Sequence, residues 1–92
     1  MNINFYANFR QIIGEKTVTL DLSPGNTLHE LVVALVNRFP ALGPALTGET
    51  GQLLPYIHIF VNGRDVQFLP DGFSTVVTSA DKIDIFPPVA GG

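Results

Sequence analysis

The residues of this chain best suited to covalent chemistry are the last two, Gly91 and Gly92. Glycine has no Cβ, so a diglycine end is a thin strip of backbone that closes on a carboxylate and fits a channel too narrow for other residues. Pro87 and Pro88 stiffen the base of this strip, because proline fixes φ and cannot donate a ladder hydrogen bond. At roughly 3.3 Å per extended residue, the tail is expected to reach about 20 Å from the body. We predict a compact domain over 1–86 and a reactive tail over 87–92.

Cysteine is absent from the chain, which restricts its covalent chemistry further. No disulfide, thiolate metal site, persulfide or cysteine nucleophile can form. If the protein forms a covalent link or carries sulfur, the carboxylate of Gly92 is therefore the expected place. His29 and His58 are too few and too separated for a metal site. Asp81 and Asp84 flank the start of a predicted strand without an implied pocket, which argues against an acid–base pair. We therefore expect no catalytic side chains and no metal site.

Composition indicates one ordered domain without the charge pattern of a nucleic-acid binder. The 92 residues are 46% hydrophobic and 14% charged, which disfavours disorder. The net charge of −3 provides no basic footprint for nucleic acid. No apolar run is long enough to cross a bilayer, and no basic region followed by an apolar stretch marks the N-terminus. The expected location is the cytoplasm.

The first half of the chain predicts a hairpin followed by a helix. Residues 2–9 alternate like a strand with Ile3, Phe5 and Ala7 inward, residues 10–15 read as a loop or short helical turn, and 17–22 alternate again. Thr27 and Glu30 have the spacing of a capping box, and apolar residues recur at helical intervals over 27–39. Pro40 should stop this helix. A short helical turn at 41–46 and a mobile loop at 47–54 are expected next.

The second half predicts strands joined by turns, with residues 73–77 either irregular or a short strand. Residues 56–61 form the strongest strand pattern, and Asn62-Gly63 is a tight-turn signal that could return a short strand at 64–68. The last strand is expected at 82–86, with Asp81 capping the turn before it. This order suits an α+β fold, the β-grasp or ubiquitin-like arrangement. It would have a mixed sheet of four to five strands, one main helix, and the first and last strands parallel.

Four segments resemble the MoaD/ThiS family of ubiquitin-like sulfur carriers. They are the aromatic-Ala-x-x-Arg-x-x-x-Gly opening at 6–14, the Asn-Gly turn at 61–63, the turn at 80–83 and the ending Phe-Pro-Pro-Val-Ala-Gly-Gly at 86–92. Ala80 departs from the glycine usual in the third segment. The ending is the specific one and is close to that of molybdopterin synthase small subunits.

The resemblance implies that Gly92 is adenylated and then converted to a thiocarboxylate. A ubiquitin-activating-type adenylyltransferase would use ATP for this step, and the carrier itself would bind no cofactor stably. The large subunit of a molybdopterin synthase, or an equivalent acceptor enzyme, would receive the tail and direct the sulfur onto a pterin precursor of the molybdenum or tungsten cofactor. The threading segment would be Pro87, Pro88, Val89, Ala90 and Gly91.

Alternatives to the pterin pathway stay open. The chain is longer than compact carriers and in that respect resembles carriers for cysteine biosynthesis. A thiazole precursor for thiamine or a transfer RNA could also be the acceptor. The chain could instead be a protein modifier joined to lysines through Gly92, or a plain interaction module with an inert tail.

Aromatic residues at outward strand positions predict a partner surface. The candidates for this surface are Tyr6, Tyr56, His58, Phe60 and Phe86, of which Tyr6 and Phe86 match positions resembling the family's interface aromatics. Arg10 could pair with an acidic residue of the activating enzyme or form a local salt bridge. Alternatively, the loop at 47–55 or a dimer contact covers these aromatics.

Overall fold

The computed structural model describes residues 1–21, 25–48, 53–54 and 56–87. Five strands form one mixed sheet with the order β2-β1-β5-β3-β4. The first and last strands of the chain are parallel neighbours, and the other pairs are antiparallel. The strands are β1 (Asn2–Phe5), β2 (Thr17–Thr19), β3 (His58–Val61), β4 (Arg64–Asp65) and β5 (Lys82–Phe86). This is the predicted β-grasp topology, with β5 at the centre of the sheet.

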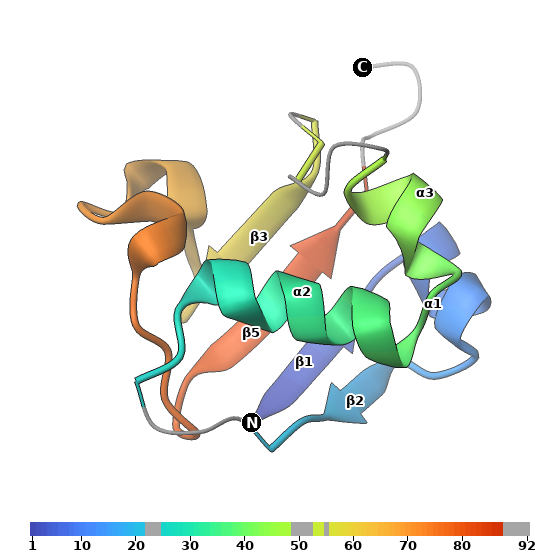
Figure 1. Cartoon of the computed structure of the whole chain (residues 1–92), viewed down its shortest axis with the longest axis horizontal. Coiled ribbons are helices and arrows are strands. Elements are labelled where there is room, and N and C mark those ends of the chain that lie inside the picture. The colour runs from blue at the N-terminus through green and yellow to red at the C-terminus, as the bar shows by residue number, and fades with distance from the viewer. Residues whose placement is uncertain (22–24, 49–52, 55, 88–92) are drawn as a thin grey trace.

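One main helix crosses the sheet, as Figure 1 shows, and it begins where the capping box predicted. This helix, α2 (Leu28–Arg38), has Thr27 as its N-cap, and Thr27 and Glu30 exchange both hydrogen bonds of the capping box. Together these bonds satisfy backbone donors that the first helical turn leaves free. The shorter helix α3 (Leu42–Leu46) follows Pro40, at the predicted position.

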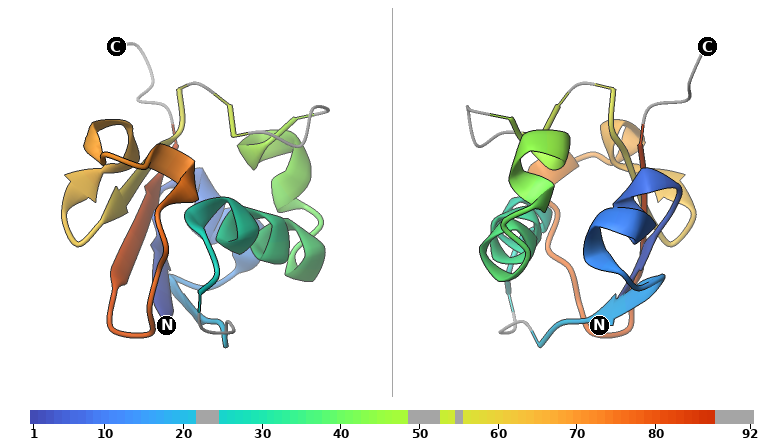
Figure 2. Two further views of the ribbon diagram at one scale, coloured as in Figure 1. Left: turned by 60° about the vertical axis from the view of Figure 1, so that its left-hand side comes forward. Right: turned by 90° about the vertical axis from the view of Figure 1, so that its right-hand side faces the viewer.

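The core lies between the sheet and the helices, which occupy one side of the sheet in both views of Figure 2. Alternate residues of the central strands, among them Ile83, Ile85 and Ile59, are fully buried and belong to one hydrophobic cluster with Leu28, Leu31 and Leu35 of α2. Because strand side chains alternate between faces, the intervening residues of β3 and β5 point to the other side. The outer face of the sheet therefore carries residues such as Phe60, Asp84 and Phe86.

The first predicted strand is too long. Strand β1 ends at Phe5, and helix α1 (Asn8–Ile13) begins within the last two residues of the expected strand and continues into the loop or short helical turn predicted at 10–15. Ala7 is exposed rather than inward, with φ 53° and ψ −129°, a backbone conformation that breaks the alternation. Gly14 ends α1 in the left-handed region at φ 85°, where glycine avoids a Cβ clash.

Other boundaries also differ from the predictions. Strand β3 begins at His58, two residues later than expected, and β4 contains only Arg64 and Asp65 before a 3₁₀ turn over Val66–Phe68. The tight turn between them is confirmed, since Asn62 and Gly63 have φ of 53° and 84°, as a type I′ hairpin requires. A second 3₁₀ turn, Gly72–Ser74, lies where an irregular segment or a short strand was expected.

The loop predicted over 47–54 is only partly described. Thr47 is buried, and its hydroxyl donates to the carbonyl oxygen of Gly43 at 3.2 Å, so the start of this segment packs against α3. Residues 49–52, together with Leu22 of the second predicted strand, lie outside the described residues. In the described part of the chain, no helix is long and apolar enough to span a bilayer.

Candidate functional site

Three aromatic rings meet on the outer face of the sheet where β5 ends. The Tyr6 ring stacks on the Phe86 ring with centroids 4.2 Å apart and planes 11° from parallel. Phe60 and Phe86 meet edge-to-face, with a centroid distance of 5.4 Å and an interplanar angle of 86°. Offset-stacked and edge-to-face pairs are the geometries that aromatic quadrupoles favour. We call Tyr6, Phe60 and Phe86 the aromatic cluster.

Strand register brings the cluster together. Phe86 lies opposite His58 in the antiparallel pairing of β5 with β3, and Phe60 lies opposite Asp84 one step along the same face. Tyr6 directly follows β1, the parallel neighbour of β5 on its other side. Because Pro87 immediately follows Phe86, the cluster adjoins the base of the predicted tail.

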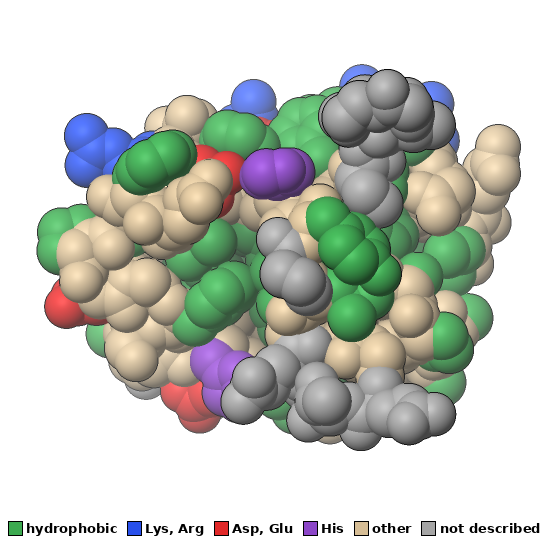
Figure 3. All heavy atoms as spheres, turned by 90° about the horizontal axis from the view of Figure 1, so that it is seen from above, with side chains coloured by type: hydrophobic (Ala, Val, Ile, Leu, Met, Phe, Trp, Pro, Cys, Tyr) green, Lys and Arg blue, Asp and Glu red, His purple; other side chains and the backbone are tan. Residues whose placement is uncertain are grey.

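Hydrophobic side chains are partly exposed at this end of the molecule. Figure 3 looks onto the end toward which β1 and β5 run, and it shows hydrophobic groups next to histidine, with Lys and Arg side chains toward one border. The three rings of the cluster are half-buried rather than covered. Half-buried rings of this kind retain apolar area that a partner could bury.

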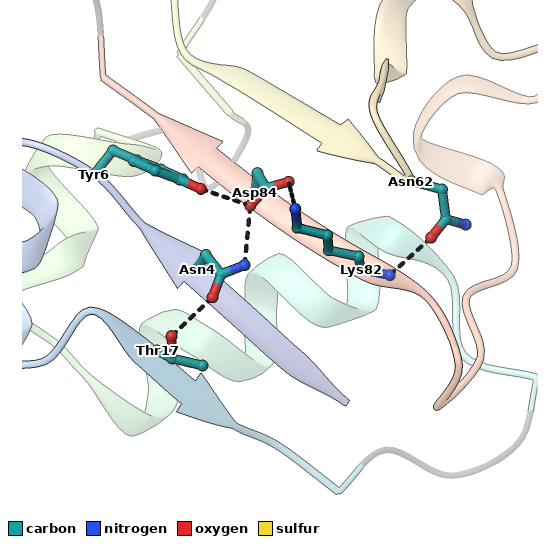
Figure 4. A network of polar contacts seen from close by, with 6 residues as sticks. All are labelled: Asn4, Tyr6, Thr17, Asn62, Lys82 and Asp84. Atoms are coloured by element: carbon teal, nitrogen blue, oxygen red, sulfur yellow. Dashed lines mark hydrogen bonds and ion pairs between the residues drawn. The ribbon is translucent and has the colours of Figure 1, made fainter.

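A buried carboxylate supports the cluster from within the sheet. Asp84 is only 7% exposed, and its Oδ1 accepts hydrogen bonds from the Tyr6 hydroxyl at 2.9 Å and from Asn4 Nδ2 at 3.0 Å. Thr17 donates in turn to Asn4 Oδ1 at 2.8 Å, and Lys82 Nζ lies 3.9 Å from Asp84 Oδ2 (Figure 4). The network therefore links β2, β1 and β5 on the outer face. The hydrogen bond to Asp84 raises the pKa of Tyr6, because it favours the neutral phenol beside a negative charge.

His58 is held by a second carboxylate at the edge of the cluster. Its Nδ1 lies 3.0 Å from Asp65 Oδ2, and since an ionised carboxylate only accepts, Nδ1 carries the proton. Burial disfavours ionisation of Asp65, but hydrogen bonds from the Gln67 backbone, from His58 and from the Gln67 side chain outweigh it and lower the Asp65 pKa. A hollow of about 200 Å³ lies beside this pair, with Leu54, Ile57 and Phe73 among its apolar walls.

The turn before β5 is closed by a third carboxylate, as predicted. Asp81 accepts hydrogen bonds from Asn62 Nδ2 at 2.9 Å and from the Thr78 backbone at 2.8 Å. The Asn62 side chain also accepts from the Lys82 backbone at 2.9 Å, which ties the β3–β4 turn to the start of β5. The bond from Asn62 is the main reason why the Asp81 pKa is lowered, followed by the bond from Thr78.

The structure gathers four of the six predicted partner-binding residues. His58 lies beside the aromatic cluster, 6.5 Å from Phe60 between ring centroids. Tyr56 is 52% exposed in the turn before β3, and Arg10 is exposed on α1; neither belongs to the cluster. Pro87 is half-buried after β5, whereas the rest of the tail, Pro88 to Gly92, lies outside the described residues.

Sequence reasoning missed the role of Asp84. It considered this residue only as half of an acid–base pair, which it rejected. An aspartate between two isoleucines of a predicted strand nevertheless indicates a carboxylate close to the core. Burying a charge is costly unless hydrogen bonds compensate, so such a residue needs specific donors nearby. In the described residues, no group of three or more His, Cys, Asp or Glu side chains could hold a metal ion.

Curated relatives match the chain over most of its length. It is 32% identical to small archaeal modifier protein 3 of Haloferax volcanii over 92 residues, which is 100% of this chain and 98% of the relative. It is 43% identical over 65 residues to a putative sulfur carrier protein of Archaeoglobus fulgidus, covering 62% of this chain and 73% of that one.

Solved structures share the fold. SAMP1 of Haloferax volcanii matches with a TM-score of 0.86 and 27% identity, over 99% of this chain and 97% of that one. A chain from the BexX/CysO complex of Amycolatopsis orientalis matches at 0.78 with 29% identity, over 99% and 98%. A putative molybdopterin converting factor subunit 1 of Pyrococcus furiosus matches at 0.76 with 25% identity, over 96% and 95%.

The family model that matches the chain extends from residue 3 to residue 92 and so includes both the aromatic cluster and the diglycine end. The fold, the length and this match agree, and the chain belongs to the ThiS family.

Proposed function

We propose that this chain is a ubiquitin-like sulfur carrier whose Gly92 carboxylate is activated as an acyl-adenylate and converted to a thiocarboxylate. The observation that carries the proposal is the family match through residue 92, which takes in the diglycine end. A similar chain named as a putative sulfur carrier supports the same chemistry. The carrier contributes the diglycine end and a docking face, and its partners contribute the catalytic groups.

The proposed reaction has two steps, adenylation and sulfur transfer. An oxygen of the Gly92 carboxylate attacks the α-phosphorus of ATP, which forms the acyl-adenylate and releases pyrophosphate. Hydrosulfide, or a donor equivalent to it, then adds to the acyl carbon, and AMP departs with the oxygen that it had bound. The product carries one sulfur in place of one oxygen. A carboxylate is a poor electrophile, and adenylation supplies the leaving group that it lacks.

The activating enzyme and the sulfur acceptor are proposed to dock on the aromatic cluster. Docked there, a partner would hold the base of the tail, because Phe86 adjoins Pro87. We further propose that the acceptor enzyme is the large subunit of a molybdopterin synthase-like complex, which passes the sulfur to a pterin precursor. The similarity to a putative molybdopterin converting factor subunit supports this acceptor.

Intact-mass analysis tests the carrier proposal. The purified chain is incubated with the adenylyltransferase of the same organism, ATP and sulfide. The expected result is a mass gain equal to the exchange of one oxygen for sulfur, which alkylation at sulfur then traps. A chain without ATP is the control. Failure of every cognate adenylyltransferase to change the mass would exclude the carrier function.

A second candidate function is a protein modifier. It is favoured by the match to small archaeal modifier protein 3 over the whole chain. In this function, a substrate lysine amine attacks the activated Gly92 carbonyl and forms an isopeptide bond. Proteolysis of cell extracts distinguishes the two outcomes. Lysines carrying a remnant of the tail favour the modifier, whereas free thiocarboxylate without conjugates favours the carrier.

A further inference from the structure

Asp84 is the one buried charged side chain among the described residues, and it lies in the central strand of the sheet. A buried carboxylate is costly unless hydrogen bonds compensate for the lost water. Oδ1 of Asp84 receives two donors, Tyr6 and Asn4, and Oδ2 faces the ammonium of Lys82. An apolar residue at this position would avoid that cost, which makes the carboxylate a candidate for a role beyond packing.

The donor Tyr6 is also one of the three rings of the aromatic cluster, where it stacks on Phe86. It lies outside any strand or helix, between β1 and α1, so no strand ladder holds its ring. Two interactions involve its side chain: the hydroxyl donates to Asp84 at 2.9 Å, and the ring stacks on Phe86 with centroids 4.2 Å apart. Phe86 in turn directly precedes Pro87, the first residue of the predicted tail.

We propose that Asp84 is a positioning residue for the docking face: it anchors the Tyr6 hydroxyl, and Tyr6 thereby holds the Phe86 ring at the base of the tail. The inference rests on the proposed function, because it assigns Asp84 to the docking of the activating enzyme. Without the anchor, the Tyr6 ring leaves Phe86, and a partner must order both side chains when it binds. Ordering rotamer-rich side chains costs binding free energy.

Kinetics of the activating enzyme test the proposal. Carrier-dependent exchange of pyrophosphate into ATP is measured for wild type, Asp84→Ala, Asp84→Asn and Tyr6→Phe. Asp84→Ala should raise the KM for the carrier by roughly three- to tenfold, the equivalent of one aromatic pair, with kcat unchanged. Asparagine retains an acceptor oxygen for both donors, so Asp84→Asn should restore most of the affinity. Tyr6→Phe should raise KM, and adding it to Asp84→Ala should have no further effect.

Asp81, in the turn directly before β5, provides a matched control. It also accepts two hydrogen bonds, but at the start of β5, away from the cluster. Asp81→Ala should leave KM unchanged at a temperature where the variant is folded. An equal rise in KM for Asp81→Ala and Asp84→Ala, or additive effects of Asp84→Ala and Tyr6→Phe, would overturn the proposal.

A readout on the free carrier separates this inference from the proposed function. Stacking on Phe86 shifts the Tyr6 ring protons upfield in the NMR spectrum, and Asp84→Ala should move them toward ordinary tyrosine values while Asp84→Asn should not. If wild type supports no exchange at all, the carrier function fails, whatever the spectrum shows. If wild type supports exchange but the ring protons of Asp84→Ala do not move, the positioning role of Asp84 fails alone.

Discussion

At the scale of single residues, the pKa of the Tyr6 phenol indicates whether its hydrogen bond to Asp84 is formed. Its pKa is raised by the hydrogen bond to Asp84, with smaller contributions from burial and from the carboxylate charge. We predict that Asp84→Ala, which removes the acceptor, lowers this pKa toward 10.0, the ordinary value for tyrosine. Absorbance of the phenolate during an alkaline titration measures it, in a Tyr56→Phe background that leaves Tyr6 as the only tyrosine. An unchanged titration curve would mean that the hydrogen bond does not form in solution.

The same shift fixes how stability depends on pH. The folded state favours the neutral phenol of Tyr6. The phenol's contribution to the free energy of unfolding is therefore fully present below the unfolded pKa and is lost as pH rises through the folded pKa. The stability difference between wild type and Tyr6→Phe should therefore narrow only on the alkaline side, starting near pH 10.0.

Ala7 is the second residue whose effect can be predicted individually. Its φ of 53° and ψ of −129° lie in a region that favours glycine, and this strain costs on the order of 1–3 kcal/mol. Ala7→Gly should relieve the strain and raise the free energy of unfolding by about 1 kcal/mol, after the extra chain entropy of glycine is subtracted. Urea unfolding measures it. The same change in α3, Ala45→Gly, is the control and should instead cost about 0.5–1 kcal/mol. Destabilisation by both changes would contradict the strained conformation.

At the scale of elements, the connection into β5 depends on Asp81. Removing its carboxylate in Asp81→Ala frees Asn62 Nδ2 and the Thr78 backbone, and we expect a loss of about 1–2 kcal/mol in the free energy of unfolding. The hydrogen bonds lower the Asp81 pKa below 3.8, so its contribution is present above that value and disappears as pH falls through the folded pKa.

Denaturant titrations between pH 2 and pH 7 check this prediction, since the gap between wild type and Asp81→Ala should close at the acid end. Asp71 is a suitable control because it is exposed and its side chain does not cap the 3₁₀ turn that follows it. Asp71→Ala should stay within about 0.5 kcal/mol of wild type at every pH. A constant gap for Asp81→Ala would show that the loss is not electrostatic.

Local signals in the sequence were sufficient to predict most elements. The capping box of Thr27 and Glu30 marks the start of α2, and Asn62-Gly63 marks the hairpin turn, because each motif satisfies its own backbone over a few residues. The end of β1 was missed because alternation continues past it, while the positive φ of Ala7 turns the chain into α1. Nothing in the pattern of residues 2–9 reveals that torsion angle.

The candidate site was predicted in part, for a similar reason. Alternation in β3 and β5 is enough to place Phe60 and Phe86 on the outer face. The role of Asp84 instead depends on register, since the parallel pairing that sets Asn4 opposite Asp84 joins segments 80 residues apart. Register between distant strands follows from the packed core, so it could not be predicted from either segment alone.

At the scale of the whole molecule, the helices cover one face of the sheet (Figure 2), and the proposed docking face is the other one. The buried hydrophobic core of the described residues extends from Ile3 to Ile85, and the aromatic cluster lies on the opposite side of β5. Substitutions in the cluster should therefore change partner affinity more than stability, whereas substitutions in the core should do the reverse. This division suits a carrier that stays folded while its partners change.

The same division predicts how the tail behaves when it is shortened. Deleting Gly91 and Gly92 removes no residue of the core described above, so the free energy of unfolding should stay within about 0.5 kcal/mol of wild type. Activation should nevertheless be lost, because adenylation and thiocarboxylate formation are proposed at the Gly92 carboxylate. Urea unfolding and intact-mass analysis measure the two properties on one sample. Gly91→Ala is the matched variant: it keeps the terminal carboxylate but adds a Cβ. It should slow adenylation without abolishing it, because the Cβ would obstruct the narrow channel that we propose for the activating enzyme. Full activity of the deletion variant would favour an interaction module with an inert tail.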